Sequence, residues 1–199
     1  MKKAKALTAA IVAGLITVGA GYAWWTDALT IKNTVNTGDL NVKFTEARVA
    51  DYSGGYVTSV VKPVQDKLIE FSLENMYPGA QETLYARFDN TGSIPAVVDK
   101  VNFTSSFLKG NNVNMIKLDG TIKVYDKNNV VQATYKFNST ANNFGKDLQD
   151  IIGGKLRVEP QGYVKFEGMN ITLDSNAPDA YEKDTLNMNL GLSFKQHNQ

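Results

Sequence analysis

The chain of 199 residues contains no cysteine, and its single histidine, His197, lies at the third position from the end. Without cysteine it can form neither a disulfide nor a thiolate metal site, and it has no cysteine nucleophile. A Ser-His-Asp triad or an HExxH zinc helix needs a histidine inside the fold, which a terminal histidine does not supply. The sequence therefore predicts a protein that is not an enzyme and that needs no metal or cofactor.

An excess of charge of either sign is also missing. Lys and Arg number 21 against 20 Asp and Glu, a net charge of +1. If residues 1–23 are removed, three lysines and no acid leave with them, so that 18 basic residues remain against 20 acidic ones. No basic stripe is present to neutralise phosphates, and nucleic acid is not an expected partner. The rest of the chain fits one domain.

The N-terminus has the pattern of an export signal. Three lysines lie within the first five residues, and no charged residue occurs in the run 6–26. Gly21 and Ala23 place small side chains at the −3 and −1 positions of a signal-peptidase site, which would leave Trp24 as the first residue of the mature chain. Residues 1–23 are therefore predicted to be a signal peptide, and the protein is expected to be secreted.

The alternative is that the same stretch stays in the membrane, because about 20 apolar residues can span a bilayer. Its composition of Ala, Gly and Thr, with no basic cluster behind it and Asp27 as the next charge, favours cleavage. Contact with a membrane is thus expected only through an uncleaved signal.

Residues 24–37 read as an extended strand directly behind the cleavage site. One face of this strand carries four apolar side chains, and the other face is mostly polar. The apolar positions are Trp25, Leu29, Ile31 and Val35. A turn over residues 36–39 then separates the strand from a domain predicted to cover residues 38–196.

Apolar and polar residues alternate in most of that domain, as in strands with one buried face. A hairpin is predicted around the turn 126–129, a bulge at Gly168 and a last strand over 186–194. One short helix is expected over 144–152, capping one end. Nine or ten such strands predict an all-β, antiparallel β-sandwich. The apolar faces give a predicted core of Leu40, Val42, Phe44, Phe71, Leu84, Phe88, Val101, Phe103, Phe166, Ile171, Leu190, Leu192 and Phe194.

Two stretches carry a resemblance to a known family. The first reads WWTD from Trp24 and continues through the turn NTGDLNV to Val42; the second reads PGAQETLYARFDNTGS from Pro78. Over residues 14–98 the chain resembles the TasA/camelysin family of surface and biofilm-matrix proteins. The resemblance implies a jelly-roll-like sandwich that polymerises into extracellular fibres, the N-terminal strand of one subunit completing the sheet of the next. The implied partner is the protein itself, and other matrix components are further candidates.

Several alternatives stay open at this point. The N-terminal strand can dock in its own sheet instead of a neighbour's. The acidic pairs Asp147 with Asp150 and Asp179 with Glu182 are typical of solvated surfaces rather than of catalysis. The loop 174–184 is rich in oxygen donors but lacks the EF-hand pattern. In place of a fibre subunit, the chain could be a monomeric surface-binding module that recognises carbohydrate or protein through the loops of the sandwich.

Overall fold

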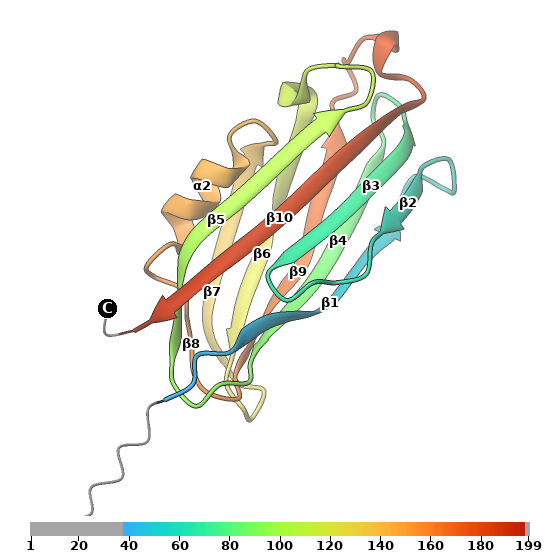
Figure 1. The fold of residues 1–199 in the computed structure, drawn as a ribbon. Coiled ribbons are helices and arrows are strands. Elements are labelled where there is room, and N and C mark those ends of the chain that lie inside the picture. The colour runs from blue at the N-terminus through green and yellow to red at the C-terminus, as the bar shows by residue number, and fades with distance from the viewer. Residues whose placement is uncertain (1–37, 198–199) are drawn as a thin grey trace, which may run out of the picture. The chain divides into compact units, whose positions relative to one another are not determined.

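A computed structural model describes residues 38–197, in which ten strands form two antiparallel sheets packed face to face (Figure 1). Sheet A has the order β1 (Val42–Asp51), β4 (Gln81–Asn90), β9 (Tyr163–Leu173), β6 (Ile116–Tyr125) and β7 (Val131–Thr140). Sheet B has the order β2 (Thr58–Val61), β3 (Leu68–Met76), β10 (Asp184–Gln196), β5 (Ala96–Phe107) and β8 (Arg157–Val158). The helical elements are α2 (Phe144–Ile152) and two 3-10 turns, η1 (Val113–Met115) and η2 (Asp179–Tyr181).

The strand order is that of a jelly roll. From β3 to β10 the chain passes from one sheet to the other at every connection except the β6–β7 hairpin, and the last two strands, β9 and β10, lie in the middle of their sheets. This is the double Greek key that defines the fold. Strands β1 and β2 are additions that extend the two sheets beside β4 and β3. The predicted antiparallel, jelly-roll-like sandwich is confirmed.

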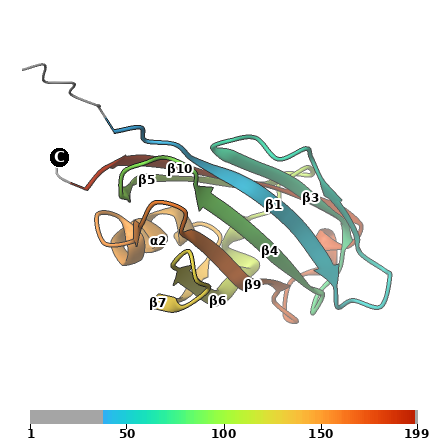
Figure 2. The same cartoon turned by 90° about the horizontal axis from the view of Figure 1, so that it is seen from below.

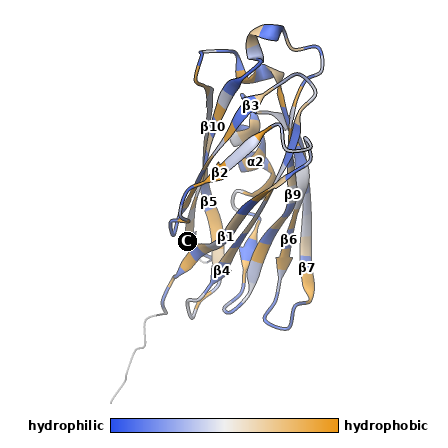
Figure 3. Ribbon diagram, turned by 90° about the vertical axis from the view of Figure 1, so that its right-hand side faces the viewer, coloured by the Kyte–Doolittle hydropathy of each residue, from blue (hydrophilic) through white to orange (hydrophobic). Residues whose placement is uncertain are grey.

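The core lies between the sheets, where alternate side chains of both sheets meet, and Figure 3 shows hydrophilic and hydrophobic residues alternating along the strands. Phe88 is near its centre, with ring centroids 5.6 Å from Phe44 and 5.3 Å from Phe194. Most of the predicted core is buried, and the other members are partly buried and pack against it. The partly buried ones are Leu40, Val101, Phe103 and Phe194.

Two of the bulges shift the alternation of apolar and polar residues within a strand. Leu84 pairs with Met169 whereas Tyr85 pairs with Glu167, so that Gly168 is the extra residue, as predicted, and its φ of +96° suits glycine. In β5 the register with β10 shifts around Asp99 in the same way. This second bulge makes the charged Asp99 the extra residue of β5.

Helix α2 has the predicted bounds and buries Phe144, Leu148 and Ile152. Its predicted place at one end of the sandwich is wrong, because the helix lies between the two sheets along the side formed by β5 and β7 (Figure 2). Strand β8 pairs only with Ala96 and Val97, which leaves most of that side of β5 without a strand. The apolar face of α2 fills this opening.

Candidate assembly edge

A sheet edge is a chemical site, because its outward backbone N–H and C=O groups can bind another strand. The described part of the chain has four edge strands, β1 and β7 in sheet A and β2 and β8 in sheet B. Two of these edges are too short to offer a ladder, since β2 has four residues and β8 has two. Pro63 follows β2 and lacks an N–H donor.

Strand β1 is ten residues long, but its edge is interrupted. The register with β4 shifts between Phe44 and Glu46, which makes Thr45 a bulged residue. The Phe44 N–H, 2.9 Å from the carbonyl oxygen of Asp66, already donates to the β2–β3 connection. Bulges and occupied backbone groups of this kind prevent a further strand from pairing.

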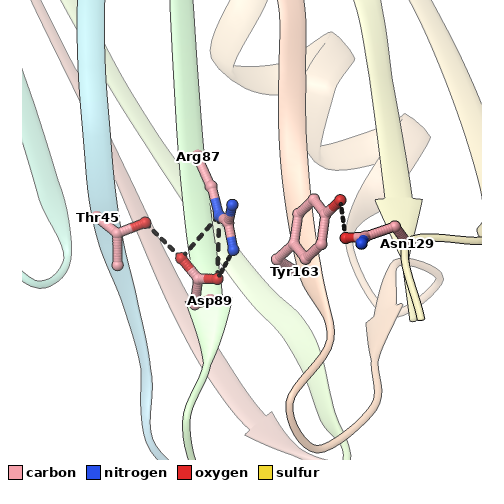
Figure 4. A network of polar contacts seen from close by, with 5 residues as sticks. All are labelled: Thr45, Arg87, Asp89, Asn129 and Tyr163. Atoms are coloured by element: carbon pink, nitrogen blue, oxygen red, sulfur yellow. Dashed lines mark hydrogen bonds and ion pairs between the residues drawn. The ribbon is translucent and has the colours of Figure 1, made fainter. Parts of the chain in front are cut away.

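The bulge in β1 is held in place by polar side chains. The Thr45 hydroxyl donates to Asp89 on β4, and the same carboxylate accepts from Arg87, with 2.5 Å between Arg87 Nη2 and Asp89 Oδ1 (Figure 4). The Arg87 guanidinium lies over the Tyr163 ring, 4.0 Å from its centroid. This edge of sheet A is therefore both irregular and rigid.

Strand β7 is also ten residues long, and within residues 38–197 it pairs with β6 alone. Its sequence, VQATYKFNST, contains one charged residue, Lys136, and no proline. Its single register shift lies at the start of the strand, opposite Val124 and Tyr125. Long edges with little charge and no interruption are the ones that accept strands.

The backbone of β7 alternates in the direction it faces. The Ala141 N–H donates to the Ile116 carbonyl across 2.9 Å, and paired residues of an antiparallel ladder alternate between bonded and non-bonded positions. By this alternation the N–H and C=O groups of Thr134, Lys136 and Asn138 point away from β6. Their side chains are exposed. An incoming strand would thus meet three consecutive sets of outward backbone groups.

The hairpin that presents this edge is fixed before any partner arrives. In the β6–β7 turn, Asp126 Oδ1 accepts from the N–H of Asn128 at 2.8 Å and of Val130 at 2.9 Å. The Tyr163 hydroxyl of β9 donates to Asn129 Oδ1 at 2.9 Å (Figure 4). The edge is therefore preorganised, which reduces the ordering entropy that strand addition costs.

A cleft of about 210 Å³ opens beside β7, toward the chain around β8. Ala133 and Tyr135 line it from β7, and the Tyr135 hydroxyl donates to the Lys155 carbonyl across 3.2 Å. Nearby, the apolar side chains of Val130 and Val131 are 54% and 45% exposed. The edge and the cleft together are a candidate site for a strand with apolar side chains on one face, and we call them the β7 site.

The site residues predicted from the sequence lie outside the described residues. They are the cleavage-site residues Gly21, Ala23 and Trp24 and the strand residues Trp25, Leu29, Ile31 and Val35. The described chain begins at Gly38, against the turn that follows β4. There the Asp39 N–H donates to Ser93 Oγ at 2.8 Å, and the Ser93 N–H donates to the Asp39 carbonyl at 2.9 Å.

The acidic residues of the loop 174–184, which were considered as metal ligands, bond to other residues of the domain. Asp174 lies 2.6 Å from Lys117 Nζ, and this contact lowers the pKa of Asp174 to about 2. The buried Asp184 accepts from the Lys109 N–H at 3.0 Å and from Asn111 Nδ2 at 2.8 Å. Over residues 38–197, no group of three or more acidic or histidine side chains is placed to hold a metal ion.

No known protein family and no curated protein matches this chain. Among the helices of residues 38–197, none has the length and hydropathy to cross a membrane.

Proposed function

We propose that this chain is a secreted structural protein that polymerises into extracellular fibres of a cell surface or biofilm matrix. In this proposal residues 24–36 of one copy add as a strand to the β7 site of the next. The observation that carries the proposal is the β7 edge, which is long, carries one charge and is regular from Ala133 to Thr140, whereas each of the other three edges is short or blocked.

The lengths of donor and acceptor agree. At about 3.3 Å per residue, residues 24–36 span about 40 Å when extended, and the ten residues of β7 span about 33 Å. The alternation of side chains along β7 also matches that of the donor segment. In β7, Tyr135 and Phe137 point inward and Lys136 points outward. A donor strand in matching orientation would continue this pattern, with Leu29 and Ile31 toward the cleft.

The point where the donor segment joins the domain favours a fibre over a closed dimer. The donor segment precedes Gly38, which lies at the β1 and β4 side of sheet A, and β7 is the opposite edge of the same sheet. Contacts between two different surfaces are heterologous, and they propagate into an open chain unless the rotation between copies closes a ring. The same geometry leaves both ends of a growing filament able to extend.

The test compares the mature chain with a variant lacking residues 24–36, by electron microscopy and sedimentation. The variant should fold and remain monomeric, and a free peptide of residues 24–36 should stop growth of the parent by occupying the β7 site. Ile31→Asp should also prevent assembly, because a carboxylate buried in the cleft costs several kcal/mol. Thr30→Asp, on the opposite face, is the matched control and should assemble. Filaments of normal length from the deletion variant would exclude the proposal.

Export is tested separately. N-terminal sequencing of material released from cells should begin at Trp24, because Gly21 and Ala23 fit the signal-peptidase site. A mature protein that retains residues 1–23 would instead support the membrane-anchored alternative.

A further inference from the structure

The outer face of sheet A carries a groove of about 780 Å³ that the assembly proposal does not use. It runs across β4, β9, β6 and β7 and begins at the loop that follows β1. Gly120 and Gly168 lie next to each other in its floor, and a Cβ on Gly168 would lie 3.3 Å from Thr83 and 3.8 Å from the Tyr85 ring. The missing side chain at Gly168 hollows the sheet surface, whereas a Cβ on Gly120 would meet the Gly168 carbonyl oxygen at 2.3 Å and the buried Phe137 ring at 2.8 Å.

The polar groups in the floor are held in fixed positions. The Thr83 hydroxyl donates to Asn170 Oδ1 at 2.9 Å, and Asn170 Nδ2 donates to Asp119 Oδ2, also at 2.9 Å. Thr83 is buried, so that the chain of bonds starts from an ordered position. The groove thereby presents carboxylate and amide groups that can accept and donate hydrogen bonds without first being ordered.

Two tyrosines form one wall. Tyr52 is 60% exposed, and the neighbouring Tyr85 hydroxyl raises the pKa of Tyr52. The Tyr85 ring is itself fixed by Arg48, whose guanidinium carbon lies 4.1 Å from the ring centroid. Each tyrosine offers an apolar ring face and a hydroxyl, a combination suited to a ligand that has both apolar and polar surfaces.

The charges along the groove do not favour an anionic ligand. Lys136 is the one basic residue in the lining, against the carboxylates of Asp119 and Glu167. Glu167 is already neutralised by Lys123, 2.5 Å away, and accepts from the Tyr125 hydroxyl. The remaining lining charges, Lys136 and Asp119, balance, so that the groove offers no excess of positive charge to a polyanion. A peptide would gain no backbone ladder here, because the groove lies on a sheet face and not on an edge.

We propose that this groove binds a neutral polysaccharide chain, whose hydroxyl groups bond with Asp119, Asn138 and Asn170 while its sugar rings pack on Tyr52 and Tyr85. The volume lies within the range of about 300–1,000 Å³ typical of ligand sites. The groove faces away from the sandwich interior, and its β7 end, at Lys136 and Asn138, adjoins the edge that is proposed to accept the donor strand. The inference goes beyond the proposed function, since it assigns the protein a second partner of different chemistry.

The test is calorimetric or NMR titration of the mature chain with cellohexaose, chitohexaose and mannohexaose as neutral probes and with hexagalacturonate as the anionic one. At least one neutral probe should bind with a Kd below about 1 mM, and hexagalacturonate should not bind. Binding of hexagalacturonate alone, or of none of the four probes, would overturn the proposal. Filament formation is measured independently by microscopy, so that neither result depends on the other.

Two tyrosine variants test whether the neutral probe binds in the groove. Tyr52→Ala should weaken the neutral probe at least about tenfold without changing the melting temperature, because the side chain is exposed. Tyr56→Ala, in the same loop but outside the groove and 74% exposed, is the matched control and should bind like the parent. Equal affinities of the two variants would place any binding elsewhere.

Discussion

Strands β1 and β7 are the two edges of one sheet and have the same length, yet they differ in charge and in whether an outward backbone group is already bonded. β1 carries a bulge at Thr45, gives its Phe44 N–H to Asp66 and contains several charged residues. β7 has one charge, and its pairing with β6 is regular from Ala133 to Thr140. The comparison shows that the sequence of a strand, and not its position alone, decides whether an edge is open.

The far end of β1 is fixed as well. The Glu82 carboxyl is fully buried, with Oε1 2.6 Å from Ser53 Oγ, and Ser53 Oγ lies 2.8 Å from Asp51 Oδ1. One serine proton cannot serve two carboxylates. We therefore assign a neutral Glu82 that donates to Ser53, which in turn donates to an ionised Asp51. Both pKa shifts agree with this assignment. Burial raises the pKa of Glu82, and the hydrogen bond from Ser53 lowers the pKa of Asp51.

The largest expected effect comes from closing the β7 edge. Lys136→Pro removes an N–H that points away from β6 and places a ring on the open side, so that the β6–β7 ladder survives while strand addition is blocked. Electron microscopy should show no filaments. Lys136→Thr, which removes the charge but keeps the N–H, should assemble normally. Parent-like filaments from the proline variant would mean that β7 is not the acceptor.

Core truncation should affect stability far more than truncation at the edge. Leu190→Ala removes a fully buried side chain from the centre of sheet B and should cost about 2–5 kcal/mol of unfolding free energy. Val131→Ala, at the exposed start of β7, should change it by less than about 0.5 kcal/mol. Denaturant unfolding of both variants measures the difference, and equal values would contradict the assigned burial.

Removing the side-chain hydrogen bond that holds the β1 bulge should have a smaller effect on the free energy of unfolding. Thr45→Ala deletes the hydroxyl that donates to Asp89 and should cost about 0.5–1.5 kcal/mol, a typical hydrogen-bond contribution. Thr134→Ala serves as the control, because Thr134 is an exposed threonine of β7 whose backbone N–H and C=O point away from β6. A Thr45 variant as stable as the Thr134 variant would show that the bulge needs no side-chain support.

The smallest effect is a pH dependence at the end of β1. The folded-state pKa of Glu82 is raised above its unfolded value, so that its contribution to stability is greatest below about pH 4 and is lost as pH rises through the folded pKa. Glu82→Gln keeps the shape without the ionisation. In thermal melts between pH 4 and 8, the melting temperature of the glutamine variant should rise relative to that of the parent as pH increases. A constant difference would refute the neutral assignment of Glu82.

Much of this fold follows from the sequence. Strands with one wet face show period-two alternation, and the spacing of Phe144, Leu148 and Ile152 before two glycines gave the bounds of α2. The pattern missed β2 over Thr58–Val61, because Val60 is 45% exposed and the strand has little apolar signal. The place of α2 could not be predicted, since it depends on the shortness of β8 in the other sheet.

The β7 site could not be read from the sequence either. Alternation identifies strands but not their order in a sheet, and whether a strand is an edge depends on that order. The one local signal was the sequence from Val131 to Thr140, ten residues of high β-propensity with a single charge. The groove on sheet A depends on Gly120 and Gly168 meeting across two strands, which is a tertiary feature.

The most direct test of the account uses the absence of cysteine in this chain. One cysteine is introduced into the donor segment, at Thr30, Lys32 or Thr34 in turn, and one at Lys136 of β7, and filaments are oxidised under mild conditions. Paired strands bring side chains within disulfide distance. The account predicts that one donor position gives ladders of covalent oligomers on non-reducing gels, and that the same donor with a cysteine at Lys43 of β1 does not. Oligomers that form through the β1 cysteine and not through β7 would contradict it.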